Sequence, residues 1–258
     1  MEITNWLKQV SQPAFPDVLW SRPENKRHAG KLLIIGGHSQ NFSAVSRAYA
    51  AAQTASVSTI RVLLPLSLQK MLAKSFPEAE FANSTNIGSF SRQALGLFLE
   101  LSEWADGVLL AGEFGRNSET AVLLENYVTK FAGQLTLAGD TLDYFINDPQ
   151  PIINRSKTTL VGPLSQIQKL AKSVALKQGA DLVQILNTLS IWSTDTKTSI
   201  VTEHSDQIIV AHRGKISTTP AKKKEVNEEV GAYISVWTLQ QPGKPFEALT
   251  TSIYCFTE

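Results

Sequence analysis

The chain has little of several features that mark particular classes of protein. Its 258 residues contain one cysteine, Cys255, so no disulfide can form within the chain. Lysine and arginine (24) nearly balance aspartate and glutamate (23), which leaves no overall field to attract nucleic acid or anionic lipid. No run approaches the roughly 20 apolar residues of a membrane helix, and the start of the chain lacks a signal-peptide core. The sequence predicts a soluble cytoplasmic protein without nucleic-acid or membrane partners.

Several motifs with a known chemistry are also missing. The four histidines, His28, His38, His204 and His212, are scattered and lack the paired spacing of metal ligands, so no metal site is predicted. The chain has no G-x-x-x-x-G-K-[ST] loop, no G-x-G-x-x-G and no G-x-S-x-G elbow. P-loop nucleotide hydrolysis, Rossmann-type dinucleotide binding and α/β-hydrolase chemistry are therefore unsupported.

What is present is a composition and a pattern typical of a globular α/β protein. Hydrophobic residues make up 43% and charged residues 18% of the chain, enough to bury a core. Short apolar runs alternate with segments of helical spacing, and such βα units in series predict a mostly parallel sheet covered by helices on both faces. Strands are expected at 31–35, 59–64, 107–111, 134–137 and 158–161, and helices at 43–54, 91–104, 118–131, 164–177 and 182–192.

The C-terminal third has a different pattern. Three short β-rich segments, 198–202, 207–211 and 215–218, are separated by turn residues and predict antiparallel strands at one edge of the sheet. Two helices, 228–240 and 246–256, should close the chain around the break at Pro242 and Gly243. No repeat or linker divides the sequence. We therefore expect one three-layer α/β/α domain over 27–258, with residues 1–26 packed on it as an extension.

Ligands of open parallel sheets bind beyond the carboxyl ends of the strands, so the loops there are the first candidates for a site. Gly36 and Gly37 lead toward a helix N-terminus, where backbone amides favour an anion, and His38 and Asn117 lie in loops that would join them. The alternative is that the glycines only fit the turn and that His38 is an ordinary surface residue. The pattern alone does not choose between these interpretations.

Other residues in these loops also have two interpretations each. Gly115, in the turn before the next helix, either lines a pocket or belongs to a solvated turn. Asp140 follows a strand and is either a carboxylate in the cleft or a helix cap. Ser43 and Ser118 are the expected N-caps of their helices. Cys255, in an apolar helix, fits a buried, unreactive thiol.

Four segments in the same order carry a resemblance to a known family. They are residues 27–37 (Arg-His-Ala-Gly-Lys-Leu-Leu-Ile-Ile-Gly-Gly), 105–110 followed by Phe-Gly-Arg-Asn at 114–117, 137–142 (Leu-Ala-Gly-Asp-Thr-Leu), and 245–248 (Pro-Phe-Glu-Ala). Over residues 27–256 the chain resembles the ADP/ATP-dependent NAD(P)H-hydrate dehydratases, which have the ribokinase-like fold. The resemblance implies a lyase that uses ADP or ATP with Mg²⁺ to remove water from hydrated NADH or NADPH, a metabolite-repair reaction.

The resemblance also implies residue roles. Ala44 would pack against the nicotinamide nucleotide, and Gly115 and Asp140 would line the substrate pocket. The family's G-x-G-D falls on residues 226–229 (Val-Asn-Glu-Glu), so Glu229 stands where the aspartate base is expected and both glycines are lost. Glutamate places its carboxylate one methylene further out, and a misplacement of about 1 Å can cost roughly a hundredfold in rate.

Three other family positions differ here. The nucleotide-facing Lys-Gly element falls on Thr202 and Glu203, which puts an acid where a lysine is expected. The T-P-H element falls on residues 161–163 (Val-Gly-Pro), without the histidine, and Glu113 replaces a glycine. We therefore expect a divergent family member with weak or no dehydratase activity, and the relatives suggest a homo-oligomer. A non-catalytic binding or scaffold protein is the alternative, and a ribokinase-like small-molecule kinase ranks lower.

Overall fold

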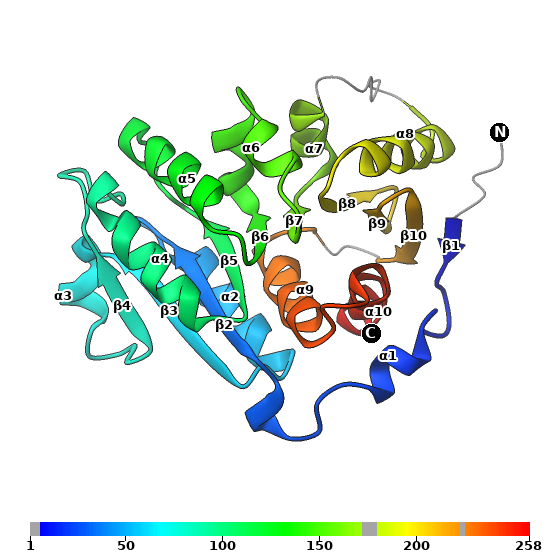
Figure 1. Ribbon diagram of the computed structural model, residues 1–258, viewed down its shortest axis with the longest axis horizontal. Helices are drawn as coiled ribbons and strands as arrows, with labels where there is room; N and C mark the ends of the chain where they lie inside the picture. Colours follow the sequence, from blue (N-terminus) through cyan, green and yellow to red (C-terminus); the bar gives the residue numbers. More distant parts are fainter. Residues whose placement is uncertain (1–5, 172–179, 222–224) are drawn as a thin grey trace.

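A central β-sheet organises the molecule (Figure 1). The computed structural model describes residues 6–171, 180–221 and 225–258, and within them ten strands form one sheet in the order β1-β10-β9-β8-β7-β6-β5-β2-β3-β4. The strands are β1 (Trp6–Lys8), β2 (Lys31–Gly36), β3 (Thr59–Pro65), β4 (Ala79–Ala82), β5 (Gly107–Gly112), β6 (Gln134–Ala138), β7 (Thr158–Val161), β8 (Ser199–His204), β9 (Gln207–His212) and β10 (Lys215–Pro220).

Helices cover both faces of the sheet, which gives three layers (Figure 1). One face carries α4 (Leu95–Trp104), α5 (Ser118–Lys130), α6 (Gln150–Ile153), α7 (Leu164–Leu170) and α8 (Leu182–Asp195). The other carries α1 (Pro16–Trp20), α2 (Ser43–Thr54), α3 (Gln69–Leu72), α9 (Glu228–Gln240) and α10 (Pro245–Thr257). Four short 3-10 segments complete the described elements: η1 (Lys26–His28), η2 (Leu66–Leu68), η3 (Arg92–Ala94) and η4 (Gly139–Phe145).

The central strands are apolar on both faces because both faces are covered. In β2, Leu33 and Ile35 belong to the core beneath α4 and α5, whereas Leu32 and Ile34 belong to the core beneath α2 and α9. A strand buried on both sides appears in sequence as a continuous apolar run, which is why the run could be recognised. Strands β2 to β8 are all parallel to one another, so their carboxyl ends lie at one edge.

The C-terminal strands are antiparallel, as the sequence predicted. Strand β9 pairs antiparallel with both β8 and β10. Beyond β10 the sheet gains a strand that the sequence did not predict: β1 pairs in parallel with β10, with Trp6 opposite Ile216. Strand β4, at the other edge, was also missed, because these strands have only three and four residues and little hydrophobic alternation.

Most helix bounds agree with the sequence pattern. Helices 43–54 and 228–240 have the expected limits. The helix expected over 164–177 begins at Leu164, but α7 ends at Leu170, and residues 172–179 lie outside the described part of the chain. Within the described residues, the longest helices are too short or too polar to cross a bilayer.

Candidate functional site

The carboxyl edge of the sheet brings together two helix N-termini. Helix α2 follows β2, and α9 packs against α2 and against β5 and β6. A helix N-terminus has unpaired backbone amides and the positive end of the helix dipole, so this edge would suit an anion if those amides were free. Their actual partners decide what can bind there.

At α2 the amides are capped by a carboxylate from another loop. Phe42, not Ser43, precedes the helix and has no capping side chain, so the prediction that Ser43 is the N-cap was wrong. Instead Glu113 accepts hydrogen bonds from the Ser43 hydroxyl (2.8 Å) and the Ala44 amide (3.0 Å). A carboxylate that reaches across from the loop after β5 had no local sequence signal, and it occupies the place of an anionic ligand.

Glu113 holds this position at a conformational cost. Its φ is +60°, in the left-handed region that non-glycine residues adopt rarely. Its backbone amide donates to Asp140 Oδ1 at 2.6 Å. Burial raises the pKa of Asp140, and the neighbouring carboxylates of Asp143 and Glu113 add to this, while the Glu113 amide and Arg116 oppose it. The Asp140 carboxyl group is therefore held by the backbone amide of Glu113, close to the carboxylates of Glu113 and Asp143.

At α9 the amides are capped from within. Asn227 is the N-cap, and its side-chain oxygen accepts from the amides of Glu229 (2.9 Å) and Val230 (3.4 Å). The preceding residue is also fixed, because the Val226 amide donates to Glu203 Oε2 at 2.6 Å. Two of the segments that depart from the family pattern, 202–203 and 226–229, are thus tied to each other.

The first residue of α9, Glu228, is buried and paired with Arg47 on α2. Arg47 Nε on α2 donates to Glu228 Oε1 at 2.6 Å, and a second guanidinium nitrogen also pairs with that oxygen. This hydrogen bond raises the pKa of Arg47. The Glu228 side chain is 8% exposed, and its other oxygen lies near Gly139, beside Asp140. Glu228 rather than Glu229 is therefore turned toward the ends of the strands, which the sequence did not reveal.

Glu229, the predicted base, lies elsewhere. Its carboxylate is 3.6 Å from Arg47 Nε and 38% exposed. It lines a cavity of about 360 Å³ between α2, α9 and α10 that includes Cys255 and Phe256. Cys255 is only partly buried, and burial raises the pKa of its thiol, so it is a poor nucleophile. The structure does not bring Glu229 into the cavity that holds Asp140.

Two other predicted residues, Asn117 and Asp140, do share a cavity. It has a volume of about 480 Å³ and lies at the carboxyl ends of β5 and β6, with Arg116, Asp143 and Tyr144 also in its wall. Burial raises the pKa of Tyr144 to about 12, so its hydroxyl stays protonated. Asn117, not Ser118, is the N-cap of α5 and accepts from Glu119 at 2.7 Å, so the Ser118 prediction was wrong.

The glycine loop after β2 is closely packed. A Cβ on Gly36 would lie 2.6 Å from the Gly112 carbonyl oxygen, and the Gly37 amide donates to that oxygen. The His38 amide donates to Asn41. Gly115 (φ +82°) packs against the His38 ring. Because the amides of Gly37 and His38 are already paired, an anion at this loop would need side-chain ligands.

Several groups that could bind an anion at the carboxyl edge are already paired within the described part of the chain. No group of three or more histidine, cysteine or acidic side chains with metal-ligand spacing exists among the residues the structure describes. Polyphosphate is held by free amides, lysine or arginine. Among the described residues, the Ala44 amide of α2 and the Glu229 and Val230 amides of α9 have partners, and Arg47, which lies between these helices, is paired with Glu228.

Comparison with known proteins supports the architecture. No family model matches the sequence, and no curated protein matches it. Among solved structures, the chain is similar to a ribokinase-like superfamily protein from Enterococcus faecalis (TM-score 0.72, 16% identity, covering 97% of this chain and 86% of that chain). It is also similar to a hypothetical protein from Streptococcus mutans (TM-score 0.74, 14% identity, 96% and 89% covered).

A third similar structure has a described activity. It is the ADP/ATP-dependent NAD(P)H-hydrate dehydratase from Bacillus subtilis, co-crystallised with ATP and Mg²⁺ (TM-score 0.68, 13% identity, 96% and 88% covered). Coverage of almost the whole of each chain, together with the three-layer arrangement and the antiparallel edge, shows that this protein has the ribokinase-like fold.

Proposed function

We propose that this protein is a divergent relative of the NAD(P)H-hydrate dehydratases that has lost the nucleotide-driven reaction and keeps a small-molecule pocket at the carboxyl edge. The similar structure from Bacillus subtilis and the four matching segments support the relationship. The loss of activity rests on one observation: the chain's own side chains occupy both helix N-termini at this edge.

The first part of the argument is electrostatic. Glu113, Asp140 and Glu228 lie at the edge, and each is at least partly buried. A nucleoside polyphosphate brought here would add negative charge to a region of low dielectric that already holds carboxylates, and repulsion in such surroundings is strong. Glu113 and Glu228, which stand where the family has glycines, thus oppose nucleotide binding directly.

The second part concerns the missing base. Glu229 is not in the wall of the pocket beside Asp140 but lines another cavity, together with Arg47 and Cys255. General-base catalysis requires the base to lie within hydrogen-bond reach of the proton it removes. If the protein does turn over a hydrated nicotinamide nucleotide, Glu229→Gln should therefore leave the rate unchanged, and loss of turnover in this variant would show that Glu229 is the base after all.

The direct test is calorimetric titration of the full chain with ADP and with ATP, each with Mg²⁺, and with NADH. We expect no heat from the nucleoside phosphates at concentrations where the Bacillus subtilis dehydratase, as positive control, binds ATP. Binding of NADH alone would identify the remaining pocket as a nicotinamide-nucleotide site. Micromolar ATP binding by the wild-type protein would contradict the proposal.

A rebuilt site provides the matched comparison. In the variant Glu113→Gly/Val226→Gly/Glu228→Gly/Glu229→Asp, the α2 carboxylate is removed and residues 226–229 become Gly-Asn-Gly-Asp. We expect this variant to bind ATP–Mg²⁺ more tightly than the wild type, because it removes two carboxylates, Glu113 and Glu228, and frees the Ala44 amide. Equal, undetectable binding by a folded variant would mean that the loss lies elsewhere in the site.

The same observations bear on the other functions. A small-molecule kinase of this fold would need the same polyphosphate cradle, so the filled helix N-termini oppose it equally. A scaffold without any ligand is favoured only if NADH and related nucleotides give no heat. The cavity beside Asp140 and Asn117 is the feature that favours ligand binding over a pure scaffold.

A further inference from the structure

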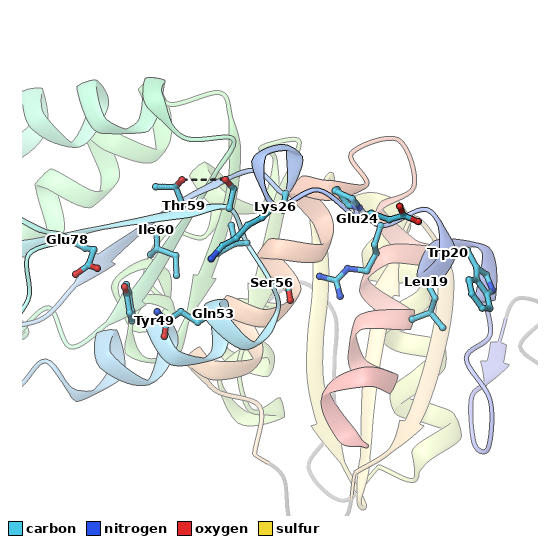
Figure 2. A pocket seen from close by; sticks show the side chains of 15 residues that line it. Leu19, Trp20, Glu24, Lys26, Tyr49, Gln53, Ser56, Thr59, Ile60 and Glu78 are labelled. Atoms are coloured by element: carbon cyan, nitrogen blue, oxygen red, sulfur yellow. Dashed lines mark hydrogen bonds between the residues drawn. The ribbon is translucent and has the colours of Figure 1, made fainter.

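A larger cavity lies at the opposite edge of the sheet, where the parallel strands begin. It has a volume of about 930 Å³ and lies between the N-terminal segment, the C-terminal end of α2 and the start of β3 (Figure 2). The 12 residues of α2 span about 18 Å, so this cavity is separated from the carboxyl-edge site by the length of that helix. Its lining is mainly polar and includes Arg22, Lys26, Gln53, Ser56 and Ser58.

Arg22 is the central feature of this cavity. Its Nε donates to Gln240 Oε1 at 3.1 Å, Nη2 donates to the Ala55 carbonyl, and the guanidinium stacks on the Trp237 ring at 4.2 Å. These partners are all uncharged. Its Nη1 makes no hydrogen bond to any residue that the structure describes, so the donor that remains is available to a ligand in the cavity.

The guanidinium also lacks a counter-ion. Arg22 is partly buried, and an arginine drawn out of water is normally paired with a carboxylate, but over residues 6–171, 180–221 and 225–258 none pairs with Arg22. Burial lowers the pKa of Arg22, which is the direction expected of a cation without compensation. An anionic ligand would supply the missing charge.

The other charged groups in the cavity wall also favour a negatively charged ligand. Lys26 has no ion-pair partner in the described chain, and Figure 2 shows its side chain directed toward the end of α2, where Gln53 and Ser56 lie. Glu24 is exposed, and its carboxylate points away from Lys26 (Figure 2). Glu78 interacts with the Tyr49 hydroxyl, whose pKa it helps to raise. The two cations are thus left facing a polar space.

We propose that this cavity binds a small molecule with a phosphate or carboxylate group, which Arg22 and Lys26 recognise while the rest of the molecule contacts Val57 and Ile60. An oxyanion accepts hydrogen bonds from guanidinium, ammonium and hydroxyl groups, and the cavity has all three. Val57 and Ile60 provide an apolar floor at the start of β3. This site shares no residue with the carboxyl-edge pocket, so it stands or falls independently of the dehydratase relationship.

The experiment is calorimetric titration of the full chain with four probes: phenyl phosphate, benzoate, inorganic phosphate and benzylamine. We expect saturable binding of phenyl phosphate or benzoate, weaker binding of inorganic phosphate because it lacks the apolar part, and none of benzylamine. The stronger of the first two identifies the oxyanion as phosphate or carboxylate. Binding of benzylamine as tight as that of the anions, or no saturable binding of any anion, would overturn the proposal.

Charge-reversal variants locate the binding. Lys26 is exposed and makes no ion pair with the described residues, so Lys26→Glu should fold and should weaken binding of the preferred anion at least tenfold. Lys70→Glu, the same change on α3 outside the cavity wall, should leave the affinity unchanged. Equal affinity of the Lys26→Glu variant and the wild type would overturn the proposal. If the Arg22→Gln variant folds, it tests the second cation in the same way. If it does not fold, the comparison of Lys26→Glu with Lys70→Glu is the test.

Discussion

The two ends of α2 are chemically opposite. At its N-terminal end, three carboxylates, Glu113, Glu228 and Glu229, surround one arginine, and the helix amides are capped by Glu113. At its C-terminal end, Arg22 binds the carbonyl of Ala55 and has no acid partner in the described chain. The overall charge of +1 conceals this polarity. The negative side chains at the N-terminal end and the positive side chain at the C-terminal end are also the charges that the helix dipole favours at those positions.

The difference between the two ends separates a site that is filled from one that is open. In this fold the carboxyl edge is where ligands are expected, yet here protein groups already satisfy its anion-binding positions. The amino edge, where no ligand is expected from the topology, has Arg22 and Lys26 beside a cavity, and neither pairs with an acid in the part of the chain that the structure describes. Local charge pairing, and not topology alone, therefore decides which edge can take an anion.

The largest effect should come from Arg47, which holds the acids together at the N-terminal end. Arg47→Ala leaves Glu228 buried without a counter-ion, and we expect a loss of about 2 kcal/mol in the free energy of unfolding, below the cost of a fully buried pair because Arg47 itself is 47% exposed. Urea denaturation at pH 7 measures it. Arg47→Ala/Glu228→Gln should regain part of the loss.

A second ion pair serves as control for Arg47. Lys244 and Asp17 lie 2.7 Å apart with both side chains at least half exposed, so Lys244→Ala should have the smaller effect. If the two alanine variants lost the same stability, Glu228 would not be a buried charge that depends on Arg47.

Arg22, at the other end, should matter somewhat less. Arg22→Ala removes two hydrogen bonds and the cover of Trp237, and we expect a loss of about 1.5 kcal/mol in the same assay. Arg22→Met keeps the apolar stem and removes a charge without a counter-ion, so it should lose less than Arg22→Ala. Equal losses for methionine and alanine would show that packing of the apolar stem contributes nothing to stability at this end.

Much of the fold could be predicted from the sequence, because it depends on local patterns. The apolar run of β2 and the helical spacing of α2 and α9 are visible without any long-range contact. Strand β1 was missed because only its pairing with β10, more than 200 residues away, makes it a strand. The antiparallel edge was found because short β-rich segments separated by turns are themselves a local signal.

The site was less accessible to sequence reasoning. Asp140 and Asn117 were found because strand ends and helix starts mark them, and they do share a cavity. The role of Glu113 depends on a loop that reaches the start of another helix, and that of Glu228 on which of two adjacent glutamates turns inward. The sequence alone favoured Glu229. Long-range capping and side-chain direction are set by packing and leave no periodic signal.

A smaller effect should follow from relieving the strain at Glu113. Glu113→Gly relieves the strain of a side chain at a left-handed φ, which should stabilise the protein by about 1 kcal/mol. It also removes the cap of α2, which should destabilise the protein by about 1 kcal/mol. The free energy of unfolding should therefore stay near that of the wild type. Glu113→Gln keeps the strain and loses the charge at the helix dipole, so it should be the less stable of the two. Equal stability of the two variants would show that φ at this position carries no strain.

The same pair of variants tests whether the N-terminal end can be opened. With the carboxylate gone and the Ala44 amide free, Glu113→Gly should gain thermal stability on addition of sulfate beyond the gain shown by the wild type. Glu113→Gln, whose side-chain oxygen can still accept from Ala44, should show a smaller gain. An identical response to sulfate in all three proteins would mean that removing Glu113 does not expose an anion site.

The smallest effect should be the pH dependence of stability that arises from Asp140, near the N-terminal end of α2. Burial raises the pKa of Asp140 in the folded protein above its ordinary value of 3.8, so the folded state binds a proton more readily than the unfolded state. The protonated Asp140 adds to the free energy of unfolding at low pH, and this addition is lost as pH rises through the folded-state pKa. At neutral pH the buried carboxylate therefore lowers the stability of the folded protein. Asp140→Asn cannot ionise and can still accept from the Glu113 amide, so it should be more stable than the wild type at pH 7.

The two proteins should converge below pH 3.8, where Asp140 is protonated in both states. Thermal unfolding from pH 3 to 7 measures the difference, with the exposed Asp195→Asn as background; a constant difference across that range would show that burial of the Asp140 charge is not its cause.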